Sequence, residues 1–268
     1  MIRVIVSGIT GRMGREVARM VLEEPSFKLV CGVALNTTEQ QTKVVFERDT
    51  AQVPCFSTLA QAFKLCQAEV VVDFTTQVVV EQHIRLAATH GVRAVVGTTG
   101  LSSKKIEALS KFCAKKKAGV IMAPNFSIGA ILMMQFAAQA AKYLPHVEII
   151  ELHHDHKLDA PSGTAVRTAE LVSQARVKSA TYEDSLDKEV LQGARGAVHK
   201  GSHVHSVRLP GLLAHHQVLL SDEGQLLSIR HESFNRSSFM PGVKMAIKKV
   251  LGLNKMVYGL DKLVACGK

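Results

Sequence analysis

The chain has 268 residues, 47% of them hydrophobic, and a net charge of +10 with Lys and Arg spread along the sequence. This length fits one large or two modest domains, and no apolar run is long enough to span a membrane. With three Tyr and no Trp, a platform of rings for stacking nucleic-acid bases is not expected. We therefore expect a basic enzyme that takes anionic ligands and binds neither nucleic acid nor membrane.

The cysteines are scattered and form no CxxC pair; they are Cys31, Cys55, Cys66, Cys113 and Cys266. This usage is typical of reduced thiols, and we interpret each as a small buried hydrophobe rather than a metal ligand or half of a disulfide. The chain enters a predicted strand directly after Met1, without the layout of a signal peptide. Together these features predict a cytoplasmic protein.

The first predicted strand, Ile2–Ser7, runs into the sequence GITGRMG and then into a helical pattern. Strand, glycine turn and helix are the context that a dinucleotide-binding fingerprint requires. In this interpretation Gly8 allows the tight turn, Gly11 allows close approach of a pyrophosphate, and Gly14 lets the helix pack on the strand. The spacing is GxxGxxG rather than the commoner GxGxxG, and an ordinary turn between a strand and a helix is the alternative.

The first half of the chain continues as alternating strands and helices. The pattern predicts strands over residues 27–34, 70–75, 92–96 and 119–122. It predicts helices over 59–66 and 102–117, and a further helix that follows the strand at 70–75 and ends at about residue 90. Residues 39–53 have little periodicity and are expected at the surface. The alternation predicts a doubly wound parallel sheet, in which ligands bind at the carboxyl ends of the strands. We expect the loops after Phe74, Val96 and Met122 to form the nicotinamide site; simple connecting turns are the competing interpretation for each.

The end of the second strand bears on cofactor choice. Sites that prefer NAD usually carry Asp or Glu there to hold the ribose 2′-OH. This chain has Leu35 and Asn36 at that point, and the nearest acid is Glu39. An uncharged strand end does not repel a 2′-phosphate, and Arg12 is a candidate to attract one. We therefore expect NADPH to be preferred, without excluding NADH.

The second half has a different pattern. A long apolar helix is predicted over 128–143, suited to core or subunit packing, followed by a strand over 147–152 and a helix over 164–175. Residues 177–203 are polar and are expected to form a loop. Antiparallel strands are predicted over 205–208, 217–220 and 226–231, and a helical segment from about 235 to 251. The strands would build an open mixed sheet, a common kind of subunit interface.

The most unusual stretch is ELHHDHKLDAPSGTA, from Glu151 to Ala165. It holds three histidines and one lysine just before Ser162, which suits the N-cap of a helix. Gly163 and Thr164 would then present backbone N–H groups, which attract an anion by about 0.3–2 kcal/mol per charge. Groups that transfer protons would thus lie beside an anion site. This arrangement predicts protonation of a carboxylate- or phosphate-bearing substrate.

Other interpretations of this stretch compete. His156 is expected to face solvent or to orient its neighbours, and Asp155 and Asp159 to fix the loop or pair with a lysine. A metal site is not expected, because the adjacent His153 and His154 point to opposite faces of a strand and no distant Cys/His set completes a tetrahedron.

Several segments together resemble the dihydrodipicolinate reductase family of the diaminopimelate–lysine pathway. They are Gly8–Gly14, Asp73–Thr75, Gly97–Gly100, Ala123–Gly129, Glu151–Ala165, His205–Gly211, Phe239–Val243 and Tyr258–Leu260. The segment HHDHKLDAPSGTA is highly specific to that family. The resemblance implies a Rossmann-type domain from residues 1–126 with 235–268. It also implies a central α+β domain, 127–234, that binds a dicarboxylate substrate and forms a homotetramer.

The resemblance also implies residue roles. His153 would be the proton donor and acceptor, and Lys157 a second proton donor or substrate-activating group. Substrate contacts would come from His154, Ser162, Gly163 and Thr164. Cofactor contacts would come from Gly8, Ile9, Thr10, Gly11, Arg12, Met13, Asn36, Gly97, Thr98, Thr99, Ala123, Pro124, Asn125 and Phe126. Asn36 and Thr37 replace the acidic and basic pair of some members. Arg208 is expected either to help hold a carboxylate or to form a structural ion pair, and His215 and His216 receive no role.

The implied reaction adds a hydride from NADPH or NADH to C4 of a cyclic dicarboxylate, adds a proton at the adjacent carbon, and loses the C4 hydroxyl as water. Two rivals share the cofactor fingerprint. An amino-acid dehydrogenase acting on aspartate or homoserine should lack the His-rich run. A dinucleotide sensor without catalysis should have lost the proton donors, yet His153 and Lys157 are both present.

Overall fold

The computed structural model describes residues 1–35, 42–45, 50–176 and 188–264, with side chains left out at 42–45 and 50–51. Its contacts divide the chain into two compact units, each described below by itself. Unit 1 comprises Met1–Ser127 and Phe239–Leu263, and unit 2 comprises Ile128–Ser238 together with Val264. No helix in the described part of the chain is long and apolar enough to cross a membrane.

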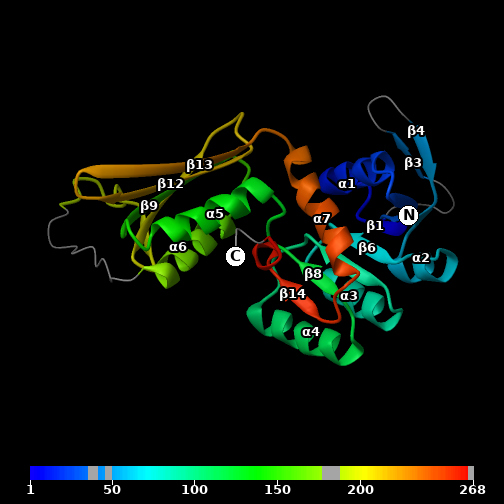
Figure 1. Cartoon of the computed structure of the whole chain (residues 1–268). Helices are drawn as coiled ribbons and strands as arrows, with labels where there is room; N and C mark the ends of the chain where they lie inside the picture. The colour runs from blue at the N-terminus through cyan, green and yellow to red at the C-terminus, as the bar shows by residue number, and fades with distance from the viewer. Residues whose placement is uncertain (36–41, 46–49, 177–187, 265–268) are drawn as a thin grey trace. The chain divides into compact units, whose positions relative to one another are not determined.

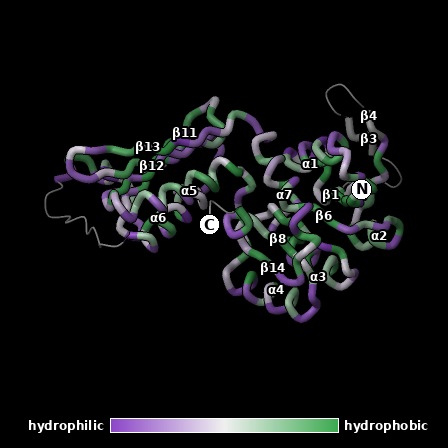
Figure 2. The backbone as a smooth tube through the Cα atoms, viewed as in Figure 1, coloured by the Kyte–Doolittle hydropathy of each residue, from purple (hydrophilic) through white to green (hydrophobic). Residues whose placement is uncertain are grey.

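Unit 1 is built on a parallel sheet of seven strands in the order β14-β8-β7-β6-β1-β2-β5 (Figure 1). The strands are β1 Ile2–Ser7, β2 Phe27–Val33, β5 Cys55–Phe56, β6 Val70–Asp73, β7 Arg93–Val96, β8 Val120–Met122 and β14 Met256–Tyr258. The central strands are hydrophobic along most of their length, as Figure 2 shows in green, because helices cover both faces of the sheet. The predicted doubly wound parallel sheet is confirmed.

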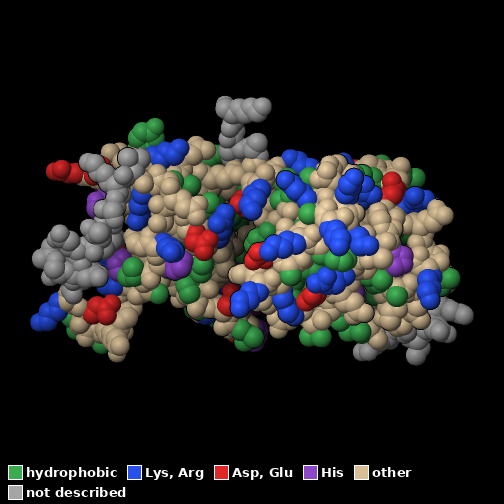
Figure 3. Space-filling view, turned by 90° about the horizontal axis from the view of Figure 1, so that it is seen from below, with side chains coloured by type: hydrophobic (Ala, Val, Ile, Leu, Met, Phe, Trp, Pro, Cys, Tyr) green, Lys and Arg blue, Asp and Glu red, His purple; other side chains and the backbone are tan. Residues whose placement is uncertain are grey.

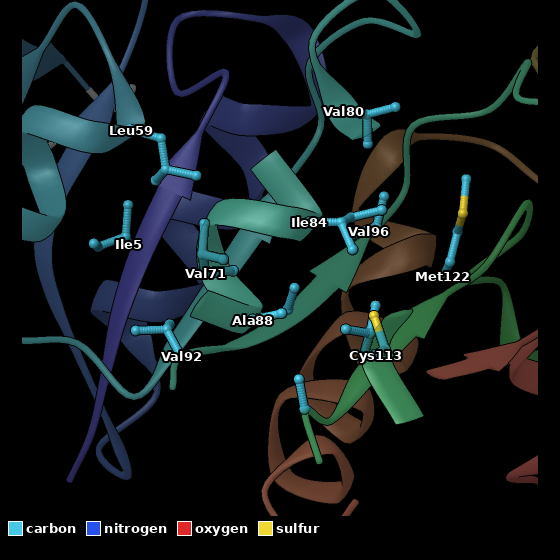
Figure 4. Packing of buried hydrophobic residues seen from close by; sticks show 14 of the residues in the cluster. Ile5, Leu59, Val71, Val80, Ile84, Ala88, Val92, Val96, Cys113 and Met122 are labelled. Atoms are coloured by element: carbon cyan, nitrogen blue, oxygen red, sulfur yellow. The ribbon is translucent and has the colours of Figure 1, made fainter. Parts of the chain in front are cut away.

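The helices of unit 1 form two layers. Helices α2 (Leu59–Leu65), α3 (Val80–Thr89) and α4 (Ser103–Lys116) share one hydrophobic core with the sheet. Figure 4 shows Ile5, Ile84 and Cys113 in this core. On the other side, α1 (Arg12–Glu23) packs beside α7 (Met240–Val250) and against the sheet.

The end of the chain completes unit 1. A short 3₁₀ helix, Arg236–Phe239, leads into α7, and β14 then pairs in parallel with β8, with Met256 opposite Val120. A second 3₁₀ helix, Leu260–Lys262, follows. The three-residue strand β14 was not predicted, because so short a segment has no readable period. The region expected only at the surface contains a two-stranded antiparallel sheet, β3 (Thr42–Val45) with β4 (Thr50–Val53).

Unit 2 is a mixed sheet of five strands in the order β10-β11-β9-β12-β13. The strands are β9 His146–His153, β10 Ala197–His199, β11 Ser202–Arg208, β12 Ala214–Asp222 and β13 Gln225–Ser233. Helices α5 (Ile128–Ala140) and α6 (Gly163–Ala175) pack together and against one face of the sheet (Figure 1). In the part of unit 2 that the structure describes, no helix covers the other face.

One strand direction was predicted wrongly. β11 was expected to be antiparallel, but it pairs in parallel with β9, with His205 opposite Ile150, and is antiparallel only to β10. The reason is α6, which carries the chain back across the sheet between β9 and β11, as a crossover between parallel strands must. β10 also lies inside the segment expected to be a loop.

Basic side chains are spread out on the face of the molecule that Figure 3 draws. Figure 3 shows Lys and Arg distributed over much of the face drawn, with Asp and Glu among them. Several form ion pairs, such as Lys244 with Glu24 at 2.6 Å and Lys105 with Glu81 at 3.3 Å.

Candidate functional site

The glycine turn of unit 1 leaves no space for side chains at its closest points. Gly8 has a φ of +83°, and a Cβ there would lie 2.7 Å from the carbonyl oxygen of Phe74. A Cβ on Gly14 would lie 1.9 Å from the carbonyl oxygen of Gly8, so that residue lets α1 pack against the turn. Gly11 is the N-cap of α1, and its N–H donates to the Gly8 carbonyl at 2.9 Å. The turn therefore presents bare backbone at the start of a helix.

A cavity of about 370 Å³ opens beside this turn, at the carboxyl ends of β1, β2 and β6. Three of the predicted residues, Gly8, Thr10 and Gly11, line it. Thr75 and Thr76 also line it and belong to the loop after Phe74, which was expected to form part of the nicotinamide site. The remaining lining residues were not assigned as cofactor contacts from the sequence: Ser7, Val33, Ala34, Leu35, Ser57, Phe74, Val79 and His83. The cavity lies where open α/β sheets bind their ligands.

A second cavity, of about 330 Å³, brings together two of the predicted loops with the start of α1. Its lining includes Arg12, Met13, Gly97, Thr98 and Thr99. Phe74, Thr75, Thr76 and Gln77, from the loop after β6, complete it. Residues expected to contact one cofactor thus converge here from three separate segments.

The other predicted cofactor residues are placed differently. Ile9 is fully buried and lines neither cavity. The segment Ala123–Phe126 lines neither cavity, although the Phe126 ring packs on Phe74 with 5.7 Å between centroids. Asn36 lies outside the described residues.

Asp73 organises these loops and was not assigned a role from the sequence. It is 1% exposed, and its Oδ1 accepts hydrogen bonds from Thr75 N at 3.0 Å, Thr75 Oγ1 at 2.7 Å and Thr98 Oγ1 at 3.0 Å. Its Oδ2 lies 2.6 Å from Nδ1 of His83, a residue that lines the larger cavity. The carboxylate thereby ties the loops after β6 and β7 to helix α3. The sequence did contain a signal for this role, because Asp73 is an acidic residue at the end of the otherwise apolar strand β6.

In unit 2 the His-rich segment starts from a buried carboxylate. Glu151 on β9 is fully buried and contacts Nδ1 of His153, two residues along the same face of the strand. Both guanidinium Nη atoms of Arg208 donate to Glu151 at 2.8 Å, and Ser162 N donates to it at 3.1 Å. Burial alone would raise the pKa of Glu151, but the hydrogen bonds from His153, Arg208 and Ser206 outweigh it and hold the pKa well below its usual range.

The loop after β9 carries the other predicted groups. Lys157 Nζ lies 2.6 Å from Oδ1 of Asp159, and its side chain is 20% exposed. For Asp159, burial raises the pKa, but the hydrogen bond and charge of Lys157 outweigh it, so the pKa is lowered. Burial and the neighbouring positive groups lower the pKa of His154. His156 is 89% exposed and takes no part in the cluster around Glu151.

The start of α6 has the expected geometry. Ser162 is its N-cap and accepts a hydrogen bond from Ala165 N at 3.2 Å. Gly163 is exposed, and a Cβ there would meet no atom within 4 Å. Thr164 follows and is half-buried. A helix start capped in this way, with open space at its first residue, can receive a carboxylate.

The structure shows the partners of Arg208, whose role was left open between two alternatives, and the neighbours of His215 and His216, which received no role. Arg208 binds Glu151 with both Nη atoms and also donates to the Asp159 carbonyl at 2.8 Å. His216 is buried opposite Glu151 on β12, and burial lowers its pKa to about 4, so it is neutral at neutral pH. His215 lies 3.6 Å from Glu232. The described residues contain no group of three or more His, Cys, Asp or Glu that could hold a metal ion.

Comparison with known proteins agrees with this geometry over the whole chain. The family model described as dihydrodipicolinate reductase, N-terminus, matches residues 2–126, and that described as dihydrodipicolinate reductase, C-terminus, matches residues 129–264. A 4-hydroxy-tetrahydrodipicolinate reductase of Listeria welshimeri is 48% identical over 98% of this chain and 99% of its own. One from Halalkalibacterium halodurans is 48% identical over 98% of this chain and all of its own.

A solved structure gives the same result. Dihydrodipicolinate reductase from Paenisporosarcina sp. TG-14, determined with dipicolinate bound, is 42% identical and superposes with a TM-score of 0.84. The match covers 98% of this chain and all of that one. The chain therefore belongs to the dihydrodipicolinate reductase family of oxidoreductases.

Proposed function

We propose that the chain reduces 4-hydroxy-tetrahydrodipicolinate to tetrahydrodipicolinate with NADPH or NADH, in lysine biosynthesis through diaminopimelate. The observation that carries this proposal is the pairing of His153 with the buried Glu151, next to a helix start suited to a carboxylate. The proton-transfer group and the anion site are thus held by one network. The rival dehydrogenase and sensor functions do not require that network.

The glycine turn fits a nicotinamide dinucleotide. Side chains at Gly8 and Gly14 would collide with backbone, and bare backbone at the start of α1 suits a pyrophosphate. When bound, the cofactor supplies the hydride. Arg12 lines the smaller cavity, and no Asp or Glu is among the described residues that line either cavity. This charge distribution supports NADPH as the preferred form, because nothing on those walls repels a 2′-phosphate.

The dicarboxylate substrate would be held at both ends in unit 2. The first turn of α6, with the hydroxyls of Ser162 and Thr164, suits one carboxylate. The cationic Lys157 and the imidazole of His154 suit the other. The dipicolinate in the related solved structure is itself a ring with two carboxylates. Lys157 is already paired with Asp159, so we expect the lysine to turn towards substrate on binding.

His153 is the proposed proton donor. Because Nδ1 is taken by the Glu151 carboxylate, which can only accept, the proton on Nδ1 stays with that hydrogen bond. Nε2 is then the ring nitrogen that can deliver a proton to the carbon next to C4. With the ring held in this orientation, Nδ1 binds Glu151 and Nε2 is left to transfer the proton.

We also propose a cytoplasmic homotetramer assembled through the sheet of unit 2. On the face that no described helix covers, Ile150 lies opposite Gln217, and Leu219 lies opposite Glu148. These side chains are only partly buried within the chain. A sheet face of this composition is suited to packing against a second copy.

The test is to follow nicotinamide absorbance in parallel with NADPH and NADH. Substrate would be generated in place from pyruvate and aspartate semialdehyde by the preceding synthase. We expect rapid oxidation with at least one cofactor and its loss in Lys157→Ala. No oxidation with either cofactor, from folded protein that binds NADPH, would reject the substrate and favour the dehydrogenase or sensor function.

A further inference from the structure

The Glu151 carboxylate is the most heavily hydrogen-bonded acid among the described residues of unit 2. It is fully buried, and its donors come from three segments of the chain: β9, the start of α6, and β11. They are the His153 ring, Ser162 N, both Nη atoms of Arg208, and the Ser206 side chain. Burying a carboxylate costs free energy unless hydrogen-bond donors satisfy its oxygens. The donors around Glu151 meet this requirement, so the residue is part of a polar network and does not serve merely to fill the core.

The two oxygens of Glu151 have different partners. Oε2 contacts Nδ1 of His153, whereas Oε1 accepts from Ser162 N at 3.1 Å. One oxygen therefore holds the ring of the proposed proton donor, and the other holds the N-cap residue of α6. A displacement of the carboxylate would move the proton donor and the anion-binding helix start together.

We propose that Glu151 is a positioning residue that fixes the tautomer and orientation of His153 and sets its place relative to the start of α6. The proposal rests on the proposed function, since it concerns the same site. Glu151 itself contacts neither substrate nor cofactor. It acts by keeping the His153 proton on Nδ1, which leaves Nε2 to exchange protons with substrate.

Arg208 is the second charged residue in the hydrogen-bond network around Glu151. Its Nη1 and Nη2 each donate to a different oxygen of Glu151 at 2.8 Å, in the planar fork geometry that arginine offers. Nη2 also donates to the Asp159 carbonyl at 2.8 Å. The guanidinium therefore compensates the buried charge and connects it to the loop that carries Lys157.

Strand β9 supplies a matched control. Glu148 precedes Glu151 by three residues, so its side chain lies on the opposite face of the strand. Like Glu151, it accepts hydrogen bonds from one arginine and one histidine. Its Oε1 lies 2.7 Å from Arg195 Nη2 and its Oε2 lies 2.9 Å from His205 Nε2. Glu148→Gln removes the same charge from the same strand without touching His153 or Ser162.

The experiment compares Glu151→Gln with Glu148→Gln by steady-state kinetics. We expect Glu151→Gln to lower kcat about ten- to a hundredfold, because a misplaced general acid loses part of its roughly 10²–10⁴-fold contribution. The Kd for NADPH should remain within about twofold, since the glycine turn lies in unit 1. Glu148 lies on the sheet face proposed to pack against a second copy, so the control is first shown by size-exclusion chromatography to keep the assembly state of the wild type. Glu148→Gln should then retain kcat within about threefold. Glu151→Asp keeps the charge and should recover part of kcat.

Nitrogen-15 NMR of histidine in the full-length protein reads the tautomer directly, with His153 assigned from a His153→Gln spectrum. At a pH where the ring is neutral, we expect the wild-type proton on Nδ1 and an Nε2–H population in Glu151→Gln. A wild-type proton on Nε2, or an unchanged kcat in Glu151→Gln, would overturn the proposal. If the wild type is inactive with the substrate, the proposed function fails, but the NMR spectra still decide the role of Glu151.

Discussion

Each unit places a buried carboxylate at or near the end of a strand and hydrogen-bonds it to Nδ1 of a histidine. In unit 1 the pair is Asp73 with His83, at 2.6 Å, and in unit 2 it is Glu151 with His153. The remaining partners differ. Asp73 receives only neutral donors from two threonines, whereas Glu151 also receives the charged fork of Arg208.

This difference separates two uses of a buried acid. Neutral donors from adjacent loops hold backbone in place, which suits unit 1, where glycines and threonines of these loops line the cavities expected to receive the cofactor. A guanidinium stabilises the ionised carboxylate, so Glu151 remains an anion beside a histidine that must gain and lose a proton. We interpret Asp73 as fixing the shape of a binding surface and Glu151 as fixing the orientation of a reacting group.

The largest expected effect is on turnover and tests His153 as the proton donor. His153→Ala should lower kcat about 10²–10⁴-fold, the usual contribution of a general acid, while NADPH binding is retained. The control is His156→Ala, because that side chain is 89% exposed and outside the network. Stopped-flow and steady-state assays measure both. Equal turnover in the two variants would remove His153 from the role.

The next effect tests charge compensation. Arg208→Met leaves the Glu151 carboxylate buried without its cation, which should cost about 3–5 kcal/mol of unfolding free energy at neutral pH. Denaturant unfolding gives the value, with Arg230→Met as control because Arg230 lies in a half-exposed surface pair. A loss below about 1 kcal/mol would show that Arg208 does not stabilise the buried charge.

The same pair predicts the acid stability of unit 2. The pKa of Glu151 is lower in the folded chain than its usual value, so its stabilising contribution is fully present above a pH of about 4.5. That contribution is lost as the pH falls below this value towards the depressed folded pKa. In Arg208→Met the folded pKa should rise, so less stability remains to be lost in acid. Thermal melts between pH 7 and pH 3 measure the two slopes, and parallel slopes would contradict the assignment.

A smaller effect tests the binding surface of unit 1. Asp73→Asn replaces an acceptor that serves Thr75, Thr98 and His83, so it should raise the Kd for NADPH about tenfold and cost about 1–3 kcal/mol of stability. The kcat at saturating cofactor should change little. Nicotinamide fluorescence titration measures the Kd. A fall in kcat at unchanged Kd would mean that Asp73 behaves like Glu151, and the distinction between the two carboxylates would disappear.

The smallest effect concerns cofactor choice. Arg12 is exposed, so its attraction for a 2′-phosphate should be worth only about 0.2–1 kcal/mol. Arg12→Ala should therefore raise the Kd for NADPH up to about fivefold and leave that for NADH unchanged. Equal changes for both forms would show that Arg12 does not recognise the 2′-phosphate.

Much of unit 1 could be predicted because its signals are local. The glycine turn and the apolar strands can be identified from neighbouring residues alone. The loops after β6 and β7 could be placed at one edge because parallel strands end on the same side. Strand β14 could not be predicted, since three residues gain their partner, β8, only through the folding of distant segments.

The network in unit 2 was missed although a signal existed. Along β9, Val147 and Ile149 point to the buried face, and Glu151 occupies the next position of the same alternation. A charged residue at an inward position predicts a buried ion pair, but its partner, Arg208, lies 57 residues away on β11. The parallel pairing of β11 with β9, which brings the two together, was itself predicted wrongly.

The central claim is that the hydride and the proton come from different sources, the hydride from the cofactor and the proton from solvent by way of His153. It is tested most directly by locating deuterium in the product by NMR. With unlabelled NADPH in deuterated water, the account predicts deuterium at the carbon next to C4 and none at C4. With NADPH deuterated at its transferable position in ordinary water, it predicts deuterium at C4 only. Solvent deuterium at C4, or loss of the cofactor label to solvent, would contradict the account.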